Sequence, residues 1–398
     1  MPYLFVGAGQ AGSSIVDEIF AHKNMEQIAT PLIFNSTIRD MQKLQHVGRD
    51  RWYGVAEGTG FVPAIRDGFE EQVTGGFGRN PVRADDVVEE NRAALEDTIR
   101  DELTAAEDES ETNVPFAFVF CGLGGGTGNG LAPHVIDVIE EYTDGTAEII
   151  AVCVLPNTQG PVGGEEASPS RQAWNTRYGL NRLEEAADGI VLVDNQRLAY
   201  HEAAEGQFTD LNEYVAASLV DLVSGPVLER IDPSEYAVDP PVIDLQDIVT
   251  SLSFGIGADR EAVGYASLGR SVQMTRSLPG YLLPYVGRRS VEASALSHLS
   301  ELKQTLEGVD TQEARKAIGL LRAPPSYISA TERQIDTSRL RAFLTARCDE
   351  VNLGATLTER HLASFTTVFT YRREDIDRLS EIESLASEYE REFGAVGT

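Results

Sequence analysis

The sequence predicts an α/β protein in which a doubly wound parallel sheet is joined by a long central helix to a smaller α+β domain. Short apolar runs alternate with helical stretches through the first half of the chain. The run at 116–120 is apolar without a break, as expected of a strand that is buried on both faces. Two glycine-rich segments each follow a strand and precede a helix, which is typical of ligand-binding doubly wound folds. The 398 residues exceed one typical domain, so two domains are expected.

The first domain is expected to alternate strands with helices. Strands are predicted at 3–6, 31–34, 116–120, 148–154 and 189–193. Helices are predicted at 10–21, 83–106, 131–142 and 171–187. Such sheets bind their ligands at the carboxyl ends of the strands, so a functional site is expected there.

The central helix is predicted at 211–228, where apolar residues repeat at the spacing of one buried helical stripe. A loop rich in proline and aspartate follows at 232–241, and a charged amphipathic helix is predicted at 373–392. Three β-rich runs lie between them, at 262–266, 317–321 and 364–371. The pattern at 269–287 predicts no element. The expected division is a first domain at 1–208, the central helix at 209–230 and a second domain at 231–398, which begins with a loop at 240–248.

Charge is the most unusual bulk property of the chain. Asp and Glu total 63 against 33 Lys and Arg, which gives a formal net charge of −30, and only four of the basic residues are lysines. Such a chain repels itself in dilute buffer, whereas molar salt shortens the Debye length to about 3 Å and screens that repulsion. The composition therefore predicts adaptation to high salt, as in a salt-loving archaeon; the alternative is an ordinary acidic protein. The same charge disfavours nucleic acid and anionic membranes as partners.

Cysteine usage and hydropathy predict the compartment. Cys121, Cys153 and Cys348 are odd in number and widely spaced, so neither a disulfide nor a metal site is expected. No apolar run approaches the roughly 18 residues that a membrane helix needs. The chain opens directly into a predicted strand without a basic region, so no signal peptide is expected. These features predict a cytoplasmic protein that does not insert into membranes.

The first glycine motif, at 7–12, reads GAGQAG and is ambiguous. It follows a strand and opens a helix, as do the dinucleotide-binding loops whose backbone N–H groups approach phosphate. An NAD site also needs an acidic residue at the end of the second strand, but that strand ends Phe34-Asn35-Ser36-Thr37. An NAD-dependent oxidoreductase is therefore a weak alternative, and a tight turn that binds nothing is another.

The second glycine motif, at 122–130, reads GLGGGTGNG. Inside regular structure each glycine costs about 0.5–1 kcal/mol relative to alanine, and a turn needs only one or two. A run this long predicts a backbone that curls around an anion and offers it successive N–H donors, with the Thr127 hydroxyl as another donor. It is not a Walker A loop, because the GK[ST] segment is absent.

The segment GGGTGNG resembles the glycine loop that is shared by tubulins and the bacterial division protein FtsZ. The segments VGAGQAG, GLGGGTGNGLAP, LVDN, LNE, IDLQDIV and VGYAS are similar, in the same order, to the archaeal CetZ branch of that superfamily. The resemblance implies a GTP-hydrolysing cytoskeletal protein that uses GTP/GDP and Mg²⁺. It also implies self-association into head-to-tail filaments; cell shape control is the expected role, and motility and division are equally compatible with such a filament.

Carried over residue by residue, the resemblance implies a phosphate site built from several loops. The residues that match its two glycine loops are Gln10, Ala11, Gly12, Ser13, Ser14, Gly124, Gly125, Gly126, Thr127, Gly128 and Asn129. Asn35 follows the second strand, and Gly78 and Asn80 match the loop that senses the γ-phosphate. In that loop Arg79 departs from the pattern; it either supplements the phosphate charge or points outward. Arg171 matches a phosphate-side arginine.

The resemblance places the base and the ribose beside a second group of residues. Asn195 matches the asparagine that binds guanine. Phe208 and Asn212 lie four residues apart on one helical face and match residues that stack on the purine and read its edge. Ordinary core packing is the alternative for Phe208. Glu166 is the expected ribose contact, although the insertion GPVGG leaves Glu165 open as well.

The segment at 242–247 resembles the NxDxxD catalytic loop of FtsZ, with Val242 in place of the asparagine. Asp244 and Asp247 share a helical face, where they can polarise an attacking water and help to organise Mg²⁺. The resemblance implies that a neighbouring subunit supplies these acids, so that stacking completes each active site. Helix capping by Asp244 and a dipole contact by Asp247 are the alternative. The main alternative function is a GTP-binding regulator that does not polymerise or hydrolyses slowly, which Val242, Arg79 and the insertion favour.

Overall fold

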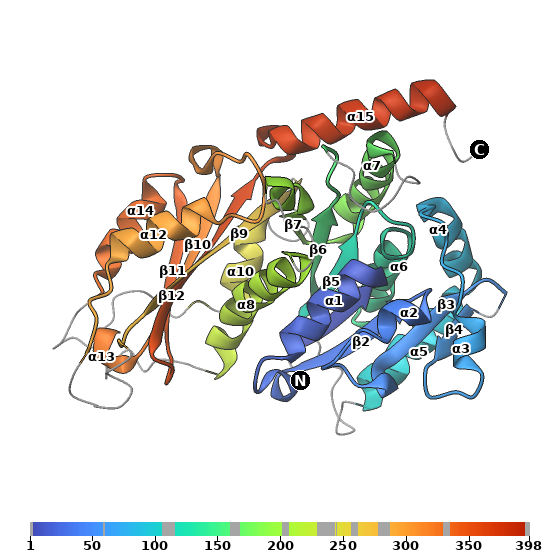
Figure 1. Ribbon diagram of the computed structural model, residues 1–398, viewed down its shortest axis with the longest axis horizontal. Coiled ribbons are helices and arrows are strands. Elements are labelled where there is room, and N and C mark those ends of the chain that lie inside the picture. Colours follow the sequence, from blue (N-terminus) through green and yellow to red (C-terminus); the bar gives the residue numbers. More distant parts are fainter. Residues whose placement is uncertain are drawn as a thin grey trace. The chain divides into compact units, whose positions relative to one another are not determined.

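The computed structural model describes residues 3–58, 60–105, 116–159, 168–200, 207–228, 243, 245–255, 262–277, 287–328 and 335–394. By its internal contacts the chain forms two compact units, residues 1–216 with 377–398 and residues 217–376 (Figure 1). In the described ranges no helix is long and apolar enough to cross a membrane.

The sheet of the first unit has the strand order β7–β6–β5–β1–β2–β3–β4. Its strands are β1 (Tyr3–Ala8), β2 (Ala29–Asn35), β3 (Trp52–Ala56), β4 (Gly60–Pro63), β5 (Phe116–Gly122), β6 (Glu148–Leu155) and β7 (Gly189–Asp194). Neighbouring strands are parallel except for β3 and β4, which are antiparallel. The order runs outward from β1 through β2 in one direction and from β5 through β6 in the other. The carboxyl ends of β1 and β5 therefore form the switch point at which such folds bind ligands.

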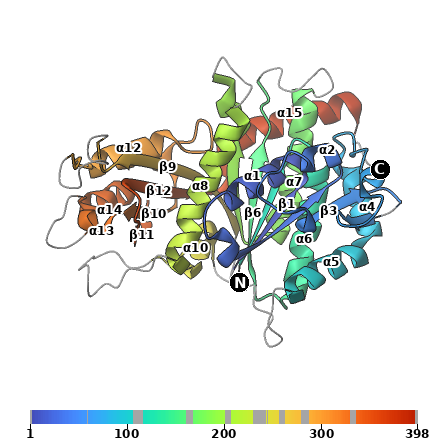
Figure 2. The ribbon, with the colours of Figure 1, turned by 60° about the horizontal axis from the view of Figure 1, so that its bottom comes forward.

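Helices cover this parallel sheet, as the alternation of strands and helices predicts. Figure 2 shows α1 and α2 on one side of the strands and α5 and α6 on the other. The helices of this unit are α1 (Gly9–Phe20), α2 (Ile38–Met41), α3 (Phe69–Gln72), α4 (Pro81–Glu90), α5 (Arg92–Ala105), α6 (Thr127–Tyr142), α7 (Pro169–Ala186) and α15 (Asp377–Phe393). The predicted doubly wound parallel sheet is confirmed.

Strands β1 and β5 form the centre of the first core and are buried along almost their whole length. The Phe5 ring stacks on Phe118 and Phe120, with centroids 5.1 and 5.8 Å away. Cys121 and Cys153 are free, buried thiols, and their sulfur atoms lie 3.9 Å apart on neighbouring strands. A hydrogen bond with Cys121 and burial raise the pKa of the Cys153 thiol, so it is an inert part of the core.

The single helix predicted at 83–106 was wrong, because the chain forms two helices that are separated at Asn91. The Asn91 amide nitrogen donates a hydrogen bond to the Val87 carbonyl at 2.7 Å. Asparagine side chains compete with the backbone for such bonds, which favours a helix end. Strands β3 and β4 had no prediction, since they are short and their glycines and proline interrupt the apolar pattern.

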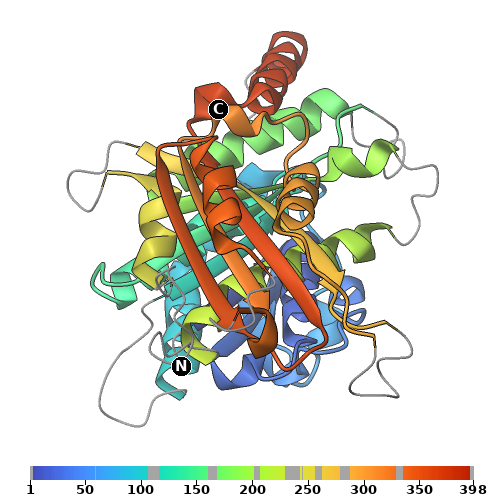
Figure 3. The same cartoon turned by 90° about the vertical axis from the view of Figure 1, so that its left-hand side faces the viewer.

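The second unit contains a mixed sheet with the order β11–β10–β12–β9, and β8 pairs with β9 (Figure 3). Its strands are β8 (Ser253–Phe254), β9 (Ala262–Met274), β10 (Lys316–Ala323), β11 (Glu350–Leu357) and β12 (Leu362–Tyr371). Its helices are α10 (Leu245–Leu252), α12 (Ala293–Leu302), α13 (Pro325–Ile328) and α14 (Thr337–Thr345). The central helix α8 (Gln207–Leu228) crosses the division between the units. Strand β9 extends into the segment at 269–287 that had no prediction, because buried serines break its apolar alternation.

Asp221 anchors the C-terminal part of α8 to the sheet of the second unit. Its carboxylate is 2% exposed and forms ion pairs with Arg270 at 2.7 Å and Arg322 at 3.0 Å. The hydroxyls of Ser364 and Thr366 donate to the same carboxylate. A buried carboxylate needs such partners, because desolvation disfavours its charge.

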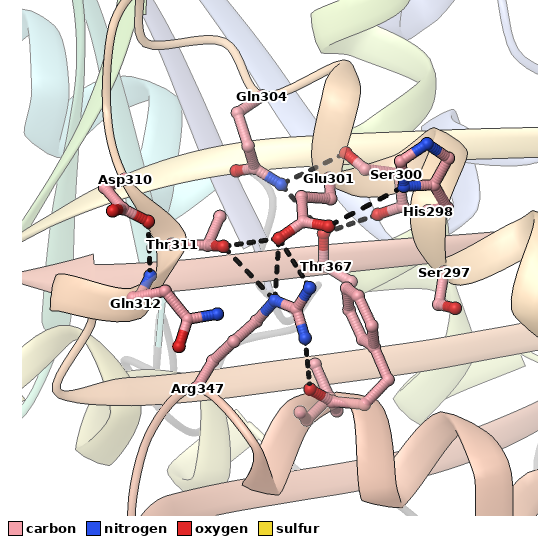
Figure 4. A network of polar contacts seen from close by, with 12 residues as sticks. Ser297, His298, Ser300, Glu301, Gln304, Asp310, Thr311, Gln312, Arg347 and Thr367 are labelled. Atoms are coloured by element: carbon pink, nitrogen blue, oxygen red, sulfur yellow. Dashed lines mark hydrogen bonds and ion pairs between the residues drawn. The ribbon is translucent and has the colours of Figure 1, made fainter.

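A second polar network joins α12 to the sheet of this unit (Figure 4). Glu301 accepts a hydrogen bond from the Thr311 hydroxyl at 2.5 Å and one from Arg347 at 2.7 Å. The hydroxyls of Ser300 and Thr367 lie 2.6 Å apart, and Gln304 donates to Thr367 at 3.0 Å. These contacts explain how an amphipathic helix with several serines is held on its sheet.

Helix α15 belongs by its contacts to the first unit and lies along α7 (Figure 1). The Trp174 indole donates to Glu390 at 3.2 Å, and Arg177 pairs with Glu383 at 3.1 Å. The sequence division grouped this helix with the residues before it. An amphipathic pattern shows that a helix packs on one face but does not identify the partner.

Candidate functional site

Helices α1 and α6 begin beside each other at the carboxyl ends of β1 and β5. A Cβ atom on Gly9 would lie 2.8 Å from the backbone nitrogen of Gly128, so the two helix starts are in contact. Among the described residues no side chain caps either start. Free N–H groups and the positive ends of two helix dipoles therefore meet at the switch point of the sheet.

The first glycine motif serves packing as well as access. A Cβ atom on Gly12 would overlap the Phe120 carbonyl, so glycine lets α1 approach β5 closely. The hydroxyls of Ser13 and Ser14 donate to carbonyls of their own helix, at 2.6 and 3.0 Å. Gln10 is exposed and Ala11 is half-buried at the helix start.

The second glycine motif forms the loop between β5 and α6. A Cβ atom on Gly125 would meet only the Gly122 carbonyl, at 3.8 Å, so internal packing does not require glycine at this position. A bare backbone with free space beside it fits the approach of an anion. Asn129, in contrast, is fully buried, and its amide donates to the Leu123 and Asn175 carbonyls at 2.7 and 2.6 Å. Asn129 therefore braces the loop from inside, and its Oδ1 has no hydrogen-bond partner in the described structure.

The end of β2 adds polar groups to the same place. Asn35 is 2% exposed, and its amide nitrogen has no hydrogen-bond partner in the ranges that the structure describes. The hydroxyl of Ser36 lies 2.6 Å from that of Thr127, which joins β2 to the start of α6. Sequence reasoning missed Ser36, although it directly follows Asn35 at a strand end. An unpaired buried amide donor is costly unless a ligand or water satisfies it.

The loop at 76–80 lies between β2 and the second glycine motif. Its Gly76 nitrogen donates to the Ser36 carbonyl at 3.3 Å, and a Cβ on Gly126 would lie 2.9 Å from the Asn80 nitrogen. Asn80 caps α4, since its Oδ1 accepts from the nitrogens of Val82 and Arg83. Gly78 and Arg79 both have a φ of 58°, a left-handed conformation that is unusual for arginine.

Arg171 and Asn175 hold this loop from α7. Arg171 donates to the Gly78 carbonyl at 3.0 Å, and the Asn175 amide donates to the Arg79 carbonyl at 2.9 Å. The same amide lies 3.1 Å from the Gly124 carbonyl. Asn175, which is 1% exposed, thus links the loop at 76–80 to the glycine loop. Sequence reasoning missed it, and its only signal was the one-turn spacing from Arg171.

Helix α4, which follows the 76–80 loop, is held by a charged cluster on α6 and α7. Asp85 accepts from the Tyr178 hydroxyl at 2.6 Å, pairs with Arg182 at 2.6 Å and lies 2.5 Å from the His134 ring. Burial alone would raise the pKa of Asp85, but His134, Tyr178 and Arg182 hold it below its ordinary value. The loop therefore leads into a fixed helix.

The expected base-binding residues occupy the ends of β7 and α8. Asn195 follows β7 directly, is half-buried and opens the short helix η3 (Asn195–Tyr200). Asn212 is half-buried in the first turns of α8, one turn beyond Phe208. The Phe208 side chain, Glu165 and Glu166 lie outside the described residues.

The expected catalytic acids and the phosphate loops belong to different units of the chain. Asp247 lies half-buried in the first turn of α10, in the second unit. Asp244 and Val242 lie outside the described residues. Among the residues that can be searched, no group of three His, Cys, Asp or Glu side chains could hold a metal alone. In nucleotide sites Mg²⁺ is usually bound by one or two carboxylates together with substrate phosphates.

A family profile described as "Tubulin/FtsZ family, GTPase domain" matches residues 54–201. The "Tubulin-like protein CetZ" of Thermococcus kodakarensis is 26% identical over 242 residues, which are 59% of this chain and 54% of that protein. The alignment thus spans about half the length of this relative. CetZ5 of Haloferax volcanii is 25% identical over 362 residues, covering 88% of this chain and 79% of the relative.

Solved structures show the same fold. CetZ2 from Haloferax volcanii, described as a GTPγS-bound protofilament, superimposes with a TM-score of 0.68 at 17% identity. The match covers 98% of this chain and all of that one. The profile, the relatives and the fold confirm the resemblance predicted from the glycine loop. Residues 54–201 thus match the GTPase domain of the Tubulin/FtsZ family, and the chain is similar in sequence and in fold to CetZ proteins.

Proposed function

We propose that this protein binds GTP in its first unit and hydrolyses it where a second copy completes the site, forming head-to-tail filaments. The observation that carries the proposal is the meeting of the uncapped starts of α1 and α6 at the switch point of the sheet. Two helix N-termini with a bare glycine backbone between them suit a polyphosphate.

The phosphate chain would lie between the two glycine loops. Backbone N–H groups at Gln10 and Ala11 and at 124–127 are the donors, and the Thr127 and Ser36 hydroxyls add polar contacts. The buried amide nitrogen of Asn35 has no hydrogen-bond partner among the described residues, so a phosphate oxygen would supply the acceptor that it needs. The loop at 76–80, held by Arg171 and Asn175, would contact the terminal phosphate, as the resemblance implies.

The guanine base would lie at the ends of β7 and α8. An asparagine side chain offers both a donor and an acceptor, which can pair with the mixed edge of guanine. Asn195 and Asn212 are the candidates, Phe208 would stack on the purine, and Glu166 would contact the ribose.

Among the described residues assigned above to the phosphate site, none is a carboxylate that could orient a water for hydrolysis. We assign this role to Asp244 and Asp247 of the adjoining copy, which would orient a water for attack on the γ-phosphorus. The water oxygen forms a bond to the γ-phosphorus while the bond from that phosphorus to the β–γ bridging oxygen breaks. GDP keeps the bridging oxygen, and the released phosphate carries the oxygen of the water. When bound, Mg²⁺ neutralises charge on the β- and γ-phosphate oxygens. An interface of this kind is heterologous and open, so it produces filaments, which would suit a cytoplasmic role in cell shape control.

Phosphate release at increasing protein concentration, in molar KCl with GTP, tests this function. Sites shared between subunits predict that activity per molecule rises with concentration, and electron microscopy should show filaments. GTP binding with activity per molecule that is constant or absent would favour the alternative, a GTP-binding regulator. The departures Val242 and Arg79 are the observations that favour that alternative.

A further inference from the structure

Arg378 is a buried arginine in the first turn of α15, near the C-terminal end of the chain. It is 4% exposed, and each of its nitrogens has a partner in the first unit. Nε donates to Asp194 Oδ2 at 3.0 Å, Nη1 to Thr158 Oγ1 at 2.9 Å and Nη2 to the Pro156 carbonyl at 2.7 Å. Nη1 also pairs with Glu381, one turn along α15. This one side chain thus joins α15 to the segments that follow β6 and β7.

The stability of α15 itself does not explain this arginine. A cation in the first turn faces the positive end of the helix dipole, which is unfavourable. Burial of a guanidinium costs further free energy unless it is paired. Asp194 is fully buried, so each of the two charges satisfies the other. The ion pair between Arg378 and Asp194 therefore stabilises the end of β7 as well as the start of α15.

Asp194, which pairs with Arg378, directly precedes Asn195, the proposed guanine-reading residue. The second oxygen of Asp194 accepts a hydrogen bond from the Gln196 nitrogen at 2.9 Å, which fixes the backbone on both sides of Asn195. Thr158 donates to the Gln196 side chain at 3.2 Å. These hydrogen bonds form a closed network of Arg378, Asp194, Gln196 and Thr158. Asn195 stands in the chain between two of its members, Asp194 and Gln196.

We propose that Arg378 is a positioning residue for base recognition, through which the C-terminal helix sets the orientation of Asn195. The proposal rests on the proposed function, because it takes Asn195 as the reader of guanine. Loss of Arg378 removes the buried cation that pairs with Asp194, and this destabilises the position of the Asp194 carboxylate at the start of η3. The contacts of Arg378 lie at the ends of β6 and β7, whereas the phosphate site lies at the ends of β1 and β5. Selectivity for the base should therefore fall more than affinity for the triphosphate.

The test compares Arg378→Ala and Arg378→Lys with Arg177→Ala. Arg177 pairs with Glu383 and Glu390 and anchors the same helix to α7, but its contacts lie away from Asn195. Lysine keeps the charge of Arg378 and so favours folding, but it lacks the planar fork that reaches three acceptors. Dissociation constants for GTP and ATP are measured in molar KCl, and hydrogen exchange of residues 189–200 is measured without nucleotide.

We expect both Arg378 variants to lose about tenfold or more of the preference for GTP over ATP, equivalent to about one lost hydrogen bond to the base. Exchange at 189–200 should be faster than in the wild type. Arg177→Ala should keep the wild-type preference and exchange. If Arg378→Lys kept the wild-type preference for GTP over ATP and the wild-type hydrogen exchange at 189–200, Arg378 would not be a positioning residue for base recognition. A wild-type protein that prefers neither nucleotide would instead contradict the proposed function, and exchange would still report whether α15 holds this segment.

Discussion

Asn175 is a buried side chain of α7 whose amide donates to the carbonyls of Arg79 and Gly124. Its replacement by alanine would leave both loops without this donor. If the loop at 76–80 contacts the third phosphate, GTP affinity should fall by about tenfold and GDP affinity by less. Fluorescence titration with both nucleotides measures the ratio, and Asn181→Ala, at an exposed position of α7, is the control. Equal losses for GTP and GDP would show that Asn175 supports the fold only.

The buried carboxylate of Asp221 should make the free energy of unfolding depend on pH. Burial alone would raise the pKa of Asp221, but Arg270, Arg322 and Ser364 hold it below its ordinary value of 3.8. Because the folded value is the lower one, the carboxylate contributes stability above about pH 3.8 and loses it as the pH falls through the folded pKa.

Asp221→Asn should lower the free energy of unfolding by about 3 kcal/mol or more at neutral pH, because two half-buried arginines lose their buried counter-charge. Urea unfolding should show this difference shrinking below about pH 3.8. Asp97→Asn, an exposed partner of Arg100, should have almost no effect. If the difference in the free energy of unfolding between the wild type and Asp221→Asn grew as the pH fell, the lowered pKa of Asp221 would be contradicted.

Residues of the site differ in how well sequence predicts them. The glycine loops were recognisable because long glycine runs are costly without a ligand. Asn195 was expected from the resemblance of the segment LVDN. Asn175 and Arg378 act through hydrogen bonds to segments far away in the chain, and no local pattern reports such contacts. Side chains at 165–166 and 244 remain predictions.

Glu301, near the end of α12, joins this helix to Thr311 and to Arg347, which follows α14 (Figure 4). Arg347→Ala removes two contacts to Glu301 and a cation–π contact with the Phe343 ring at 3.7 Å. We expect the free energy of unfolding to fall by about 1.5–3 kcal/mol, since the bonds are charged and half-buried. Arg339→Ala removes an exposed ion pair with Asp336 and should cost less than about 1 kcal/mol. Equal losses in both variants would contradict the importance of this network.

Most elements of the first sheet were predictable, because uninterrupted apolar runs mark buried parallel strands. The break at Asn91 was not, because one side-chain hydrogen bond decides it. The long strand β9 was only partly predicted, since its buried serines are satisfied by tertiary hydrogen bonds. The partner of α15 was also beyond sequence pattern.

The net charge of −30 makes a prediction for the whole molecule. Stacked copies bring like charges together, and salt reduces this repulsion over a Debye length. Pelleting with GTP should therefore increase from about 0.1 M to molar KCl, the range over which the Debye length falls from about 10 to about 3 Å. Assembly that is best in dilute buffer would contradict adaptation to high salt.

Mixing two inactive variants tests whether copies of the chain share their active sites. Gly125→Glu puts a carboxylate beside the phosphates at a position with room for a side chain, so this copy should fold but not bind GTP. A copy with Asp244→Ala and Asp247→Ala should bind GTP but lack the acids.

Phosphate release by the mixture in molar KCl is the measurement. Each variant alone should be inactive, and the mixture should regain activity, because one copy supplies the bound nucleotide and the other supplies the acids. A mixture that stays as inactive as its parts, while the wild type hydrolyses GTP, would contradict the sharing of active sites between copies.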